Sequence, residues 1–498
     1  MIKNIFKYSC LLAIAILFIQ ANFPTEGYKI NLIIEGFQGQ SMIVAYHYGD
    51  KQFIKDTVKV SDDGSFVFTD DEPLQGGMYI AFFPELKKSF EFLVSKDQQN
   101  FTLKTNLKDF VGQMKVTGSK DNELFYQYLN FLGPKRQEMG GMNQLLEKLK
   151  KDKEAAGTGN TSADLDKKIE ELTERMKVLD KSVRDFQDGL ARDNPKSFTA
   201  AIINVNKEAE IPEEISKDTA KAYYYYWEHF FDNIDLTDER LVRSPLLHPR
   251  VERFLSKSVT IQHPDTVIRA VDFILKKAEP SEEVFKFLLI RLLNKYAKSK
   301  IVCMDAVYVH MVDKYYAQGK ADWIDDEQLK KIKEDAAKLR PLLCNKVAPN
   351  IAMQTFDKPA QPKALHDIKS KYTVLFFWAP DCGHCKKAMP QMVDFYDTYK
   401  SKEVEVFAVC TKSYKSMEDC RKMIEEKDMG RWLNVVDPYY RSRFRQIYDI
   451  VVTPIIYILD ENKNIIAKKV GSEQLSEVMD QIISNDKKKE EKAVETGK

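Results

Sequence analysis

The 498-residue chain has little cysteine and almost no net charge. Seven cysteines are few for its length, so disulfide bonds are not expected to form its scaffold. The 76 basic and 75 acidic side chains leave a formal net charge of +1, which gives no electrostatic support for binding nucleic acid or a membrane surface. The length and the ordinary hydrophobic content, 44%, indicate a globular protein with about three domains.

Long apolar runs are also missing. The longest one near the N-terminus, Leu11 to Ile19, follows Lys3 and Lys7 and precedes Ala21, a small residue suited to a cleavage point. This pattern predicts a secretory signal peptide at residues 1–21. Because the run is too short to cross a bilayer, no membrane span is expected after cleavage. The sequence therefore predicts export across the inner membrane, to the periplasm or cell envelope.

Metal-ligand patterns are nearly absent. The chain has one Cys-x-x-Cys motif, at 382–385, and neither a second such motif nor a pair of histidines at ligand spacing. Cys410 and Cys420 lie ten residues apart, which does not complete a four-ligand zinc site. We expect no metal and no cofactor.

The Cys-x-x-Cys motif stands between a predicted strand and a predicted helix. An apolar run at 374–380 precedes it, and a helical stretch at 386–399 follows it. Unpaired N–H groups and the dipole at a helix N-terminus stabilise a thiolate, so Cys382 is predicted to be the attacking sulfur. Cys385, one helical turn later, is predicted to point inward and to resolve mixed disulfides.

Two charged neighbours are expected to tune Cys382 in opposite directions. A cationic His384 would stabilise the thiolate and the reduced form, which makes the couple more oxidising. The carboxylate of Asp381 would disfavour a second negative charge beside it. The direction of electron flow, as reductase, oxidase or isomerase, stays open at this point.

A second signal lies at residues 451–460, where a run rich in β-branched residues contains a proline. Proline cannot donate to a strand ladder, so Pro454 is predicted to begin a strand or to sit in a turn. The peptide bond between Thr453 and Pro454 is a candidate for the cis form.

Together, the Trp-Ala-Pro-x-Cys-x-x-Cys segment, the helix after it and the later Thr-Pro make residues 344–485 resemble the thioredoxin superfamily. The segment is most similar to the TlpA/ResA-like extracytoplasmic branch. The resemblance implies disulfide exchange with protein thiols and a membrane or periplasmic redox partner. It also implies substrate contacts by Trp378, Pro380, Thr453 and Pro454.

The sequence departs from that family at two positions. Phe376 stands where thioredoxin has a buried aspartate, and Ala388 stands where many ResA-like proteins have a glutamate. Either carboxylate would help to take a proton from the buried cysteine. Water or another side chain is therefore expected to do so here.

The other cysteines are given lesser roles. Cys303 and Cys344 fall in apolar helical contexts and are predicted to be buried small hydrophobes, not disulfide partners. Cys410 ends a predicted strand at 404–409, and a role for it as a third redox cysteine is the less favoured interpretation.

The rest of the chain is predicted to form a multidomain protein. Residues 22–117 alternate as strands do and predict an all-β, sandwich-like domain, which resembles a β domain of unknown function in secreted Bacteroidetes proteins, most strongly at 63–68. Residues 118–343 predict an all-α domain, 344–485 the α/β thioredoxin-like domain, and 486–498 a disordered charged tail. The β and helical domains carry no catalytic pattern, so binding or positioning is expected of them.

The sequence favours a thiol-disulfide oxidoreductase over two alternatives. A thiol peroxidase of the peroxiredoxin kind needs a Pro-x-x-x-Thr/Ser-x-x-Cys run, but Leu375 and Ala379 occupy the proline and hydroxyl positions. A non-enzymatic cell-envelope binding protein with a vestigial dithiol is the second alternative. The intact Cys-x-x-Cys and Thr-Pro pair make it less favoured.

Overall fold

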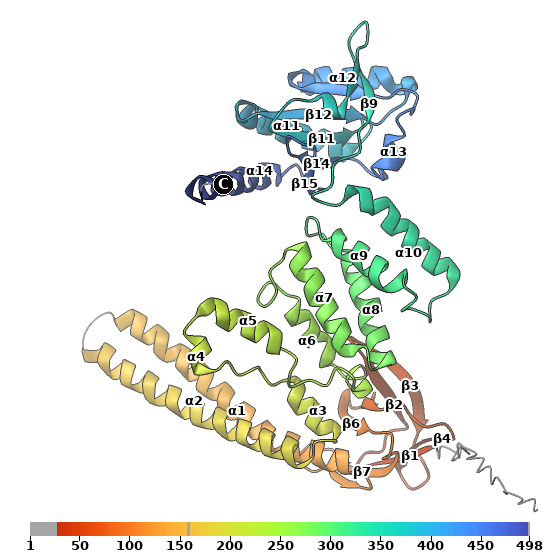
Figure 1. The fold of residues 1–498 in the computed structure, drawn as a ribbon. Coiled ribbons are helices and arrows are strands. Elements are labelled where there is room, and N and C mark those ends of the chain that lie inside the picture. Colours follow the sequence, from red (N-terminus) through yellow and green to blue (C-terminus); the bar gives the residue numbers. More distant parts are fainter. Residues whose placement is uncertain (1–26, 157–159, 497–498) are drawn as a thin grey trace, which may run out of the picture. The chain divides into compact units, whose positions relative to one another are not determined.

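The computed structural model describes residues 27–156 and 160–496, and they form two compact units (Figure 1). The first unit ends at Glu252 and the second begins at Arg253. The predicted signal peptide at 1–21 lies outside the described residues. None of the described helices combines the length and the apolar content that crossing a bilayer requires.

The first unit begins with two four-stranded sheets, in the orders β4-β1-β7-β8 and β3-β2-β5-β6. Apolar side chains at alternate positions face inward, and rings from the two sheets meet there, as Phe66 does with Phe83 at 5.8 Å between centroids. The strands are β1 (Tyr28–Glu35), β2 (Ser41–Tyr48), β3 (Lys51–Lys59), β4 (Ser65–Asp70), β5 (Gly77–Phe83), β6 (Lys88–Val94), β7 (Asn100–Asn106) and β8 (Lys115–Thr117).

Helices occupy the middle of the chain. The two longest pack against each other over Met142, Leu172 and Leu179, where an apolar seam lies between otherwise charged faces. The predicted helical domain, 118–343, extends across both compact units. The helices are α1 (Lys120–Ala156), α2 (Asn160–Asp193), α3 (Phe198–Val205), α4 (Glu213–Ser216), α5 (Thr219–His229), α6 (Leu247–Phe254), α7 (Pro264–Ala278), α8 (Glu282–Ala297), α9 (Asp305–Met311) and α10 (Asp326–Leu339).

The C-terminal part is an α/β domain with a seven-stranded mixed sheet in the order β10-β9-β13-β12-β11-β14-β15. The predicted order of β, helical and α/β regions is thus confirmed. The strands are β9 (Ala352–Thr355), β10 (Pro362–Ala364), β11 (Tyr372–Trp378), β12 (Val404–Cys410), β13 (Leu433–Val436), β14 (Ile455–Leu459) and β15 (Ile465–Lys468). The helices are α11 (Gly383–Tyr399), α12 (Met417–Glu426), α13 (Phe444–Ile447) and α14 (Leu475–Thr496).

Strand β11 is the centre of this domain, and all seven of its residues are buried. Phe376 packs on one face with side chains of α11, α12 and α14, while Phe377 packs on the other with Phe444 and Tyr448. A strand that is covered on both faces has a continuous apolar sequence, which is why this strand could be predicted from the sequence. The residues that follow β11 therefore lie at the carboxyl end of the central strands.

The C-terminal tail differs from expectation, because α14 continues through most of the predicted disordered segment, 486–498, as far as Thr496. Asp486 accepts a hydrogen bond from the Tyr372 hydroxyl at 2.7 Å, and Glu490 pairs with Lys371 at 3.1 Å. These contacts and the helical spacing of lysines and glutamates in the segment favour helix where charge density alone predicted disorder.

Cys303 and Cys344 form a disulfide, with 5.6 Å between their Cα atoms, so the prediction that they are unpaired hydrophobes is wrong. Both side chains are partly exposed. The residues are 41 positions apart, and the fold that brings them together cannot be read from local apolar patterns. The bond ties the turn before α9 to the segment that leads into the α/β domain.

Candidate active site

Cys382 lies at the point where β11 gives way to α11. Its sulfur caps the helix by accepting a hydrogen bond from the backbone N–H of Cys385 at 3.2 Å. It also lies 3.1 Å from the backbone oxygen of Thr453, to which the thiol can donate. The side chain is partly exposed, whereas that of Cys385 is fully buried. The pair therefore presents one sulfur to solvent and one to the core.

The surroundings separate the two thiols chemically. Burial raises the pKa of Cys382, but hydrogen bonds from Cys385 and from the backbone N–H of His384 outweigh it and hold the pKa below its ordinary value. Burial, together with the hydrogen bond to Cys382, raises the pKa of Cys385 to about 12. The partly exposed sulfur of Cys382 therefore ionises more readily than the buried sulfur of Cys385.

The predicted cis peptide bond between Thr453 and Pro454 is confirmed. Both residues are half-buried and come directly before β14, which pairs antiparallel with β11. This pairing brings Thr453 against Cys382. Val451 and Val452, just before them, are 81% and 67% exposed, which leaves two apolar side chains beside the dithiol.

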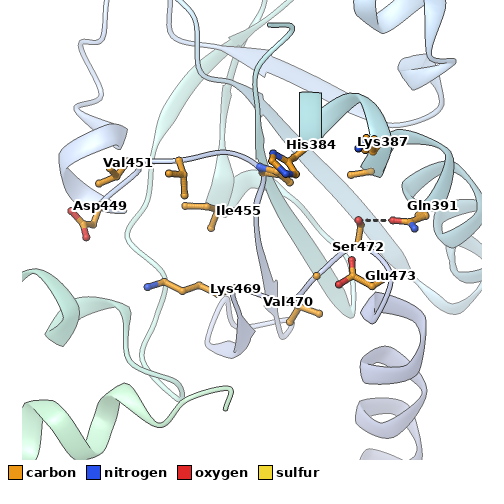
Figure 2. Close-up of a pocket in the computed structure, with 14 residues that line it drawn as sticks. His384, Lys387, Gln391, Asp449, Val451, Ile455, Lys469, Val470, Ser472 and Glu473 are labelled. Atoms are coloured by element: carbon orange, nitrogen blue, oxygen red, sulfur yellow. Dashed lines mark hydrogen bonds between the residues drawn. The ribbon is translucent and has the colours of Figure 1, made fainter. Parts of the chain in front are cut away.

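A cavity of about 590 Å³ opens next to the dithiol, and Figure 2 shows its walls. His384 and Pro454 line it together with the two exposed valines. Ser472 donates a hydrogen bond to Gln391 at 2.6 Å across one side of the cavity. Charged groups of both signs also line it: Lys387, Asp449, Lys469 and Glu473. The cavity can take a chain segment with both apolar and polar groups.

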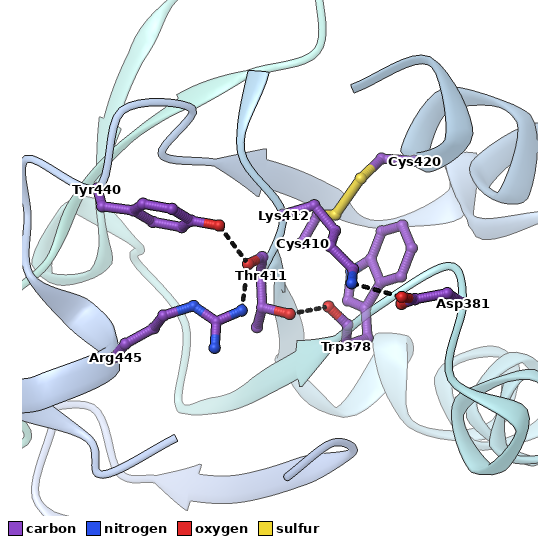
Figure 3. The surroundings of a disulfide bond; sticks show 8 residues. All are labelled: Trp378, Asp381, Cys410, Thr411, Lys412, Cys420, Tyr440 and Arg445. Carbon is purple, nitrogen blue, oxygen red and sulfur yellow. Dashed lines mark hydrogen bonds and ion pairs between the residues drawn. A yellow bond between two sulfur atoms is a disulfide. The ribbon is translucent and has the colours of Figure 1, made fainter. Parts of the chain in front are cut away.

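Asp381, predicted as a tuning residue, is engaged by a residue that the sequence analysis missed. The Nζ of Lys412 lies 2.6 Å from its Oδ2 (Figure 3). This hydrogen bond and the lysine charge lower the pKa of Asp381. Lys412 lies two residues beyond the end of β12, which runs parallel to β11. Because parallel strands end at the same edge, that position was a usable signal.

Two predicted substrate contacts are not available at the surface. The side chain of Trp378 is fully buried and packs in the core near the Cys410–Cys420 disulfide, and Pro380 is buried as well. Their burial gives no support to the predicted substrate contacts, which stay a prediction. Thr453 and Pro454 are the members of that set that keep accessible surface.

The two departures from the family pattern leave apolar groups in place of carboxylates. Phe376 is part of the core and Ala388 is buried beside the cavity. Within residues 27–156 and 160–496, no group of three His, Cys, Asp or Glu side chains is arranged to hold a metal ion.

Comparisons with known proteins agree with this geometry. Residues 344–483 match the Redoxin family model, and residues 28–125 and 165–340 match two domains of unknown function, DUF4369 and DUF5106. The match at 28–125 confirms the resemblance that the β domain showed at the level of sequence.

Several bacterial relatives match part of the chain. Sporulation thiol-disulfide oxidoreductase A of Bacillus subtilis is 30% identical over 115 residues, which is 22% of this chain and 67% of that protein. Thiol-disulfide oxidoreductase ResA of Oceanobacillus iheyensis is 33% identical over 102 residues, which is 20% of this chain. The chain spans about half the length of that second relative, 50%.

A solved structure is also similar in sequence. The crystal structure of a domain of possible thiol-disulfide isomerase from Cytophaga hutchinsonii is 38% identical, with a TM-score of 0.28, and the match covers 30% of this chain and 98% of that one. The family match covers the residues that form the dithiol site. The chain therefore belongs, through its C-terminal domain, to the ResA-like thiol-disulfide oxidoreductases of the thioredoxin superfamily.

Proposed function

We propose that the protein is an extracytoplasmic enzyme that exchanges disulfides with protein substrates through Cys382 and Cys385. One observation carries the proposal: an exposed sulfur with a lowered pKa caps α11, and a buried sulfur with a pKa of about 12 lies one turn behind it. This asymmetry suits a nucleophile and a resolving group.

The reaction follows from the asymmetry. The Cys382 thiolate attacks one sulfur of a substrate disulfide, forms a mixed disulfide and releases the other substrate sulfur as a thiolate. Cys385 then loses its proton to water and attacks the Cys382 sulfur, which releases the second substrate sulfur as a thiolate. Two electrons pass to the substrate, and the enzyme is left with a Cys382–Cys385 disulfide. Oxidation of a substrate dithiol is the reverse.

The cavity walls support a polypeptide as the substrate. The backbone oxygen of Thr453 already lies 3.1 Å from the Cys382 sulfur, and a substrate strand in that place would follow the Thr453–Pro454 backbone. Val451 and Val452 offer apolar contact to a substrate side chain next to its cysteine.

Three features support an oxidising compartment: the predicted signal peptide at 1–21, the Cys303–Cys344 disulfide and the Cys410–Cys420 disulfide. In such a compartment a reducing dithiol must itself be reduced, so we propose a membrane or periplasmic redox partner. The remaining domain boundaries, 22–117, 118–343 and 344–485, stay predictions, and so do binding or positioning roles for the first two.

The peroxidase alternative gains no support from the site. Ala379 and Leu375 are buried side chains without a hydroxyl or a ring constraint at the positions where peroxide binding would need them. The protein-disulfide proposal therefore remains the better account of the cavity.

A substitution of Val451 and Val452 by asparagine tests the substrate class. This change should raise KM for a protein disulfide such as insulin by about tenfold. A valine that a substrate buries completely contributes about 1.5 kcal/mol, and a bound substrate is expected to cover only part of each side chain. The rate with a small aromatic disulfide, which does not need contacts with the cavity walls, should stay unchanged.

The matched control is Val178→Asn, which changes an exposed valine of α2. It should leave both rates as they are. If the double asparagine variant reduces insulin with an unchanged KM, the valines do not bind substrate. If the wild-type protein exchanges thiols with neither substrate, the proposed function itself is wrong.

A further inference from the structure

The Cys410–Cys420 disulfide lies near the active site and links two cysteines ten residues apart. Cys410 is the last residue of β12 and Cys420 belongs to α12, and both are fully buried, with 6.7 Å between their Cα atoms. The proposed exchange reaction uses neither sulfur. The loop 411–416 connects β12 to α12, and its Lys412 points toward Asp381, which comes shortly before α11 (Figure 3).

The first residue of this loop is fixed from two sides. Thr411 donates to the backbone oxygen of Trp378 through its N–H at 2.8 Å and through its hydroxyl at 3.1 Å. Its own backbone oxygen accepts from Arg445 at 2.6 Å and from the Tyr440 hydroxyl at 3.4 Å. Together with the disulfide, these bonds leave the backbone at the next residue little freedom.

That next residue is Lys412, whose ammonium group lies 2.6 Å from the Asp381 carboxylate. Asp381 directly precedes Cys382, and its negative charge opposes a thiolate there. We infer that Lys412, held in place by the Cys410–Cys420 disulfide, is a positioning residue that pairs with Asp381 and so sustains the Cys382 thiolate. This inference deepens the proposed function and rests on it for its biological use.

The size of the effect follows from exposure. The side chain of Asp381 is 69% exposed and that of Lys412 is 27% exposed, and an ion pair this open to water changes an equilibrium by about fivefold or less. We therefore expect the loss of this ion pair to change the rate of Cys382 alkylation by about two- to fivefold.

Other charged groups surround the same corner. From α11 come Lys386, whose charge acts on Asp381, and His384 and Lys387, which line the cavity. Asp449, from the segment before β14, lines the cavity as well. Because these groups stay in place in every variant below, a change at Lys412 can be separated from them.

The first test is the rate at which iodoacetamide alkylates Cys382 as a function of pH, in the full chain with Cys385→Ala. Lys412→Met should raise the pKa of Cys382 and lower the rate at pH 7 by about two- to fivefold. Lys412→Arg keeps a cation in reach of Asp381 and should restore the rate. Lys415→Met, which removes an exposed lysine from the same loop, is the matched control and should change nothing.

A second background tests the pairing itself. An asparagine at position 381 has no negative charge for Lys412 to neutralise, so Lys412→Met should have little further effect in an Asp381→Asn protein. An equal fold-change in both backgrounds would overturn the pairing. So would a Lys412→Met protein that behaves like Lys415→Met.

The disulfide has its own test. Replacing Cys410 and Cys420 together by alanine should reproduce the slower alkylation, and adding Lys412→Met should not slow it further. Unchanged alkylation in the double alanine variant would show that the disulfide does not position the lysine. If this variant does not fold, the Lys412 series still decides the pairing. Alkylation needs no protein substrate, so these results are independent of whether the proposed exchange activity is found.

Discussion

Cys385→Ala is expected to turn the protein from a catalyst into a trap for its substrates. Cys382 keeps its place at the N-terminus of α11 and still attacks, but the second sulfur that releases the substrate is gone. Turnover should fall to background, and long-lived mixed disulfides with envelope proteins should accumulate. Diagonal gels, with identification of the species that a thiol releases, measure this directly.

Cys382→Ala is the matched control, because it removes the exposed sulfur and leaves the buried one. It should trap nothing, since Cys385 is fully buried and its pKa is about 12. Trapping by neither variant would reject protein substrates. Equal trapping by both would reject the division of roles between the two cysteines.

In the reduced wild-type protein, Cys382 is expected to react with iodoacetamide at pH 7 at least about tenfold faster than Cys385, because its larger thiolate fraction outweighs the higher intrinsic nucleophilicity of a more basic thiolate. Alkylation follows the thiolate fraction, which falls tenfold for each pH unit below the pKa. The pKa of Cys382 lies below its ordinary value, while that of Cys385 is raised to about 12, so the two fractions differ by three powers of ten or more. Burial of Cys385 slows its reaction further.

Peptide mass spectrometry after a timed reaction gives both rates. One modification for each chain, at Cys382, is the expected product until the protein is denatured, when Cys385 should react as well. Similar rates for the two cysteines in the folded protein would contradict the geometry of the site. A fast Cys385 and a slow Cys382 would reverse the assigned roles.

Much of the central strand and its site could be predicted from the sequence because the signals are local. The apolar run of β11 is continuous since both faces of the strand are covered. A Cys-x-x-Cys that leads directly into a helix puts the first sulfur at the cap. Pro454 marks a position where the ladder lacks a donor, and the cis bond is found there.

The features that sequence reasoning missed depend on pairing between distant segments. Lys412 meets Asp381 because Trp378 and Cys410 are partners in the parallel register of β11 and β12. The Cys303–Cys344 bond closes over 41 residues. The disulfide leaves no local pattern in the sequence, whereas Lys412 could be found only by pairing its strand with β11.

Two further expectations, for Trp378 and for the C-terminal tail, differ from the structure for another reason. The family resemblance predicts a substrate contact for Trp378, but the side chains that pack over β11 bury it. The charge density of the tail from Asp486 predicts disorder, whereas its contacts with Tyr372 and Lys371 favour a helix. In both cases, tertiary contacts determined the outcome.

A redox titration of the full chain tests the central claim most directly. The protein would be equilibrated with glutathione or dithiothreitol buffers, quenched by alkylation, and the state of each cysteine read by mass spectrometry. We predict one reversible two-electron transition of Cys382 and Cys385, between the values of thioredoxin, about −270 mV, and protein disulfide isomerase, about −180 mV. The Cys303–Cys344 and Cys410–Cys420 bonds should stay closed through it. Failure of Cys382 and Cys385 to form a disulfide reversibly at any potential would contradict the account.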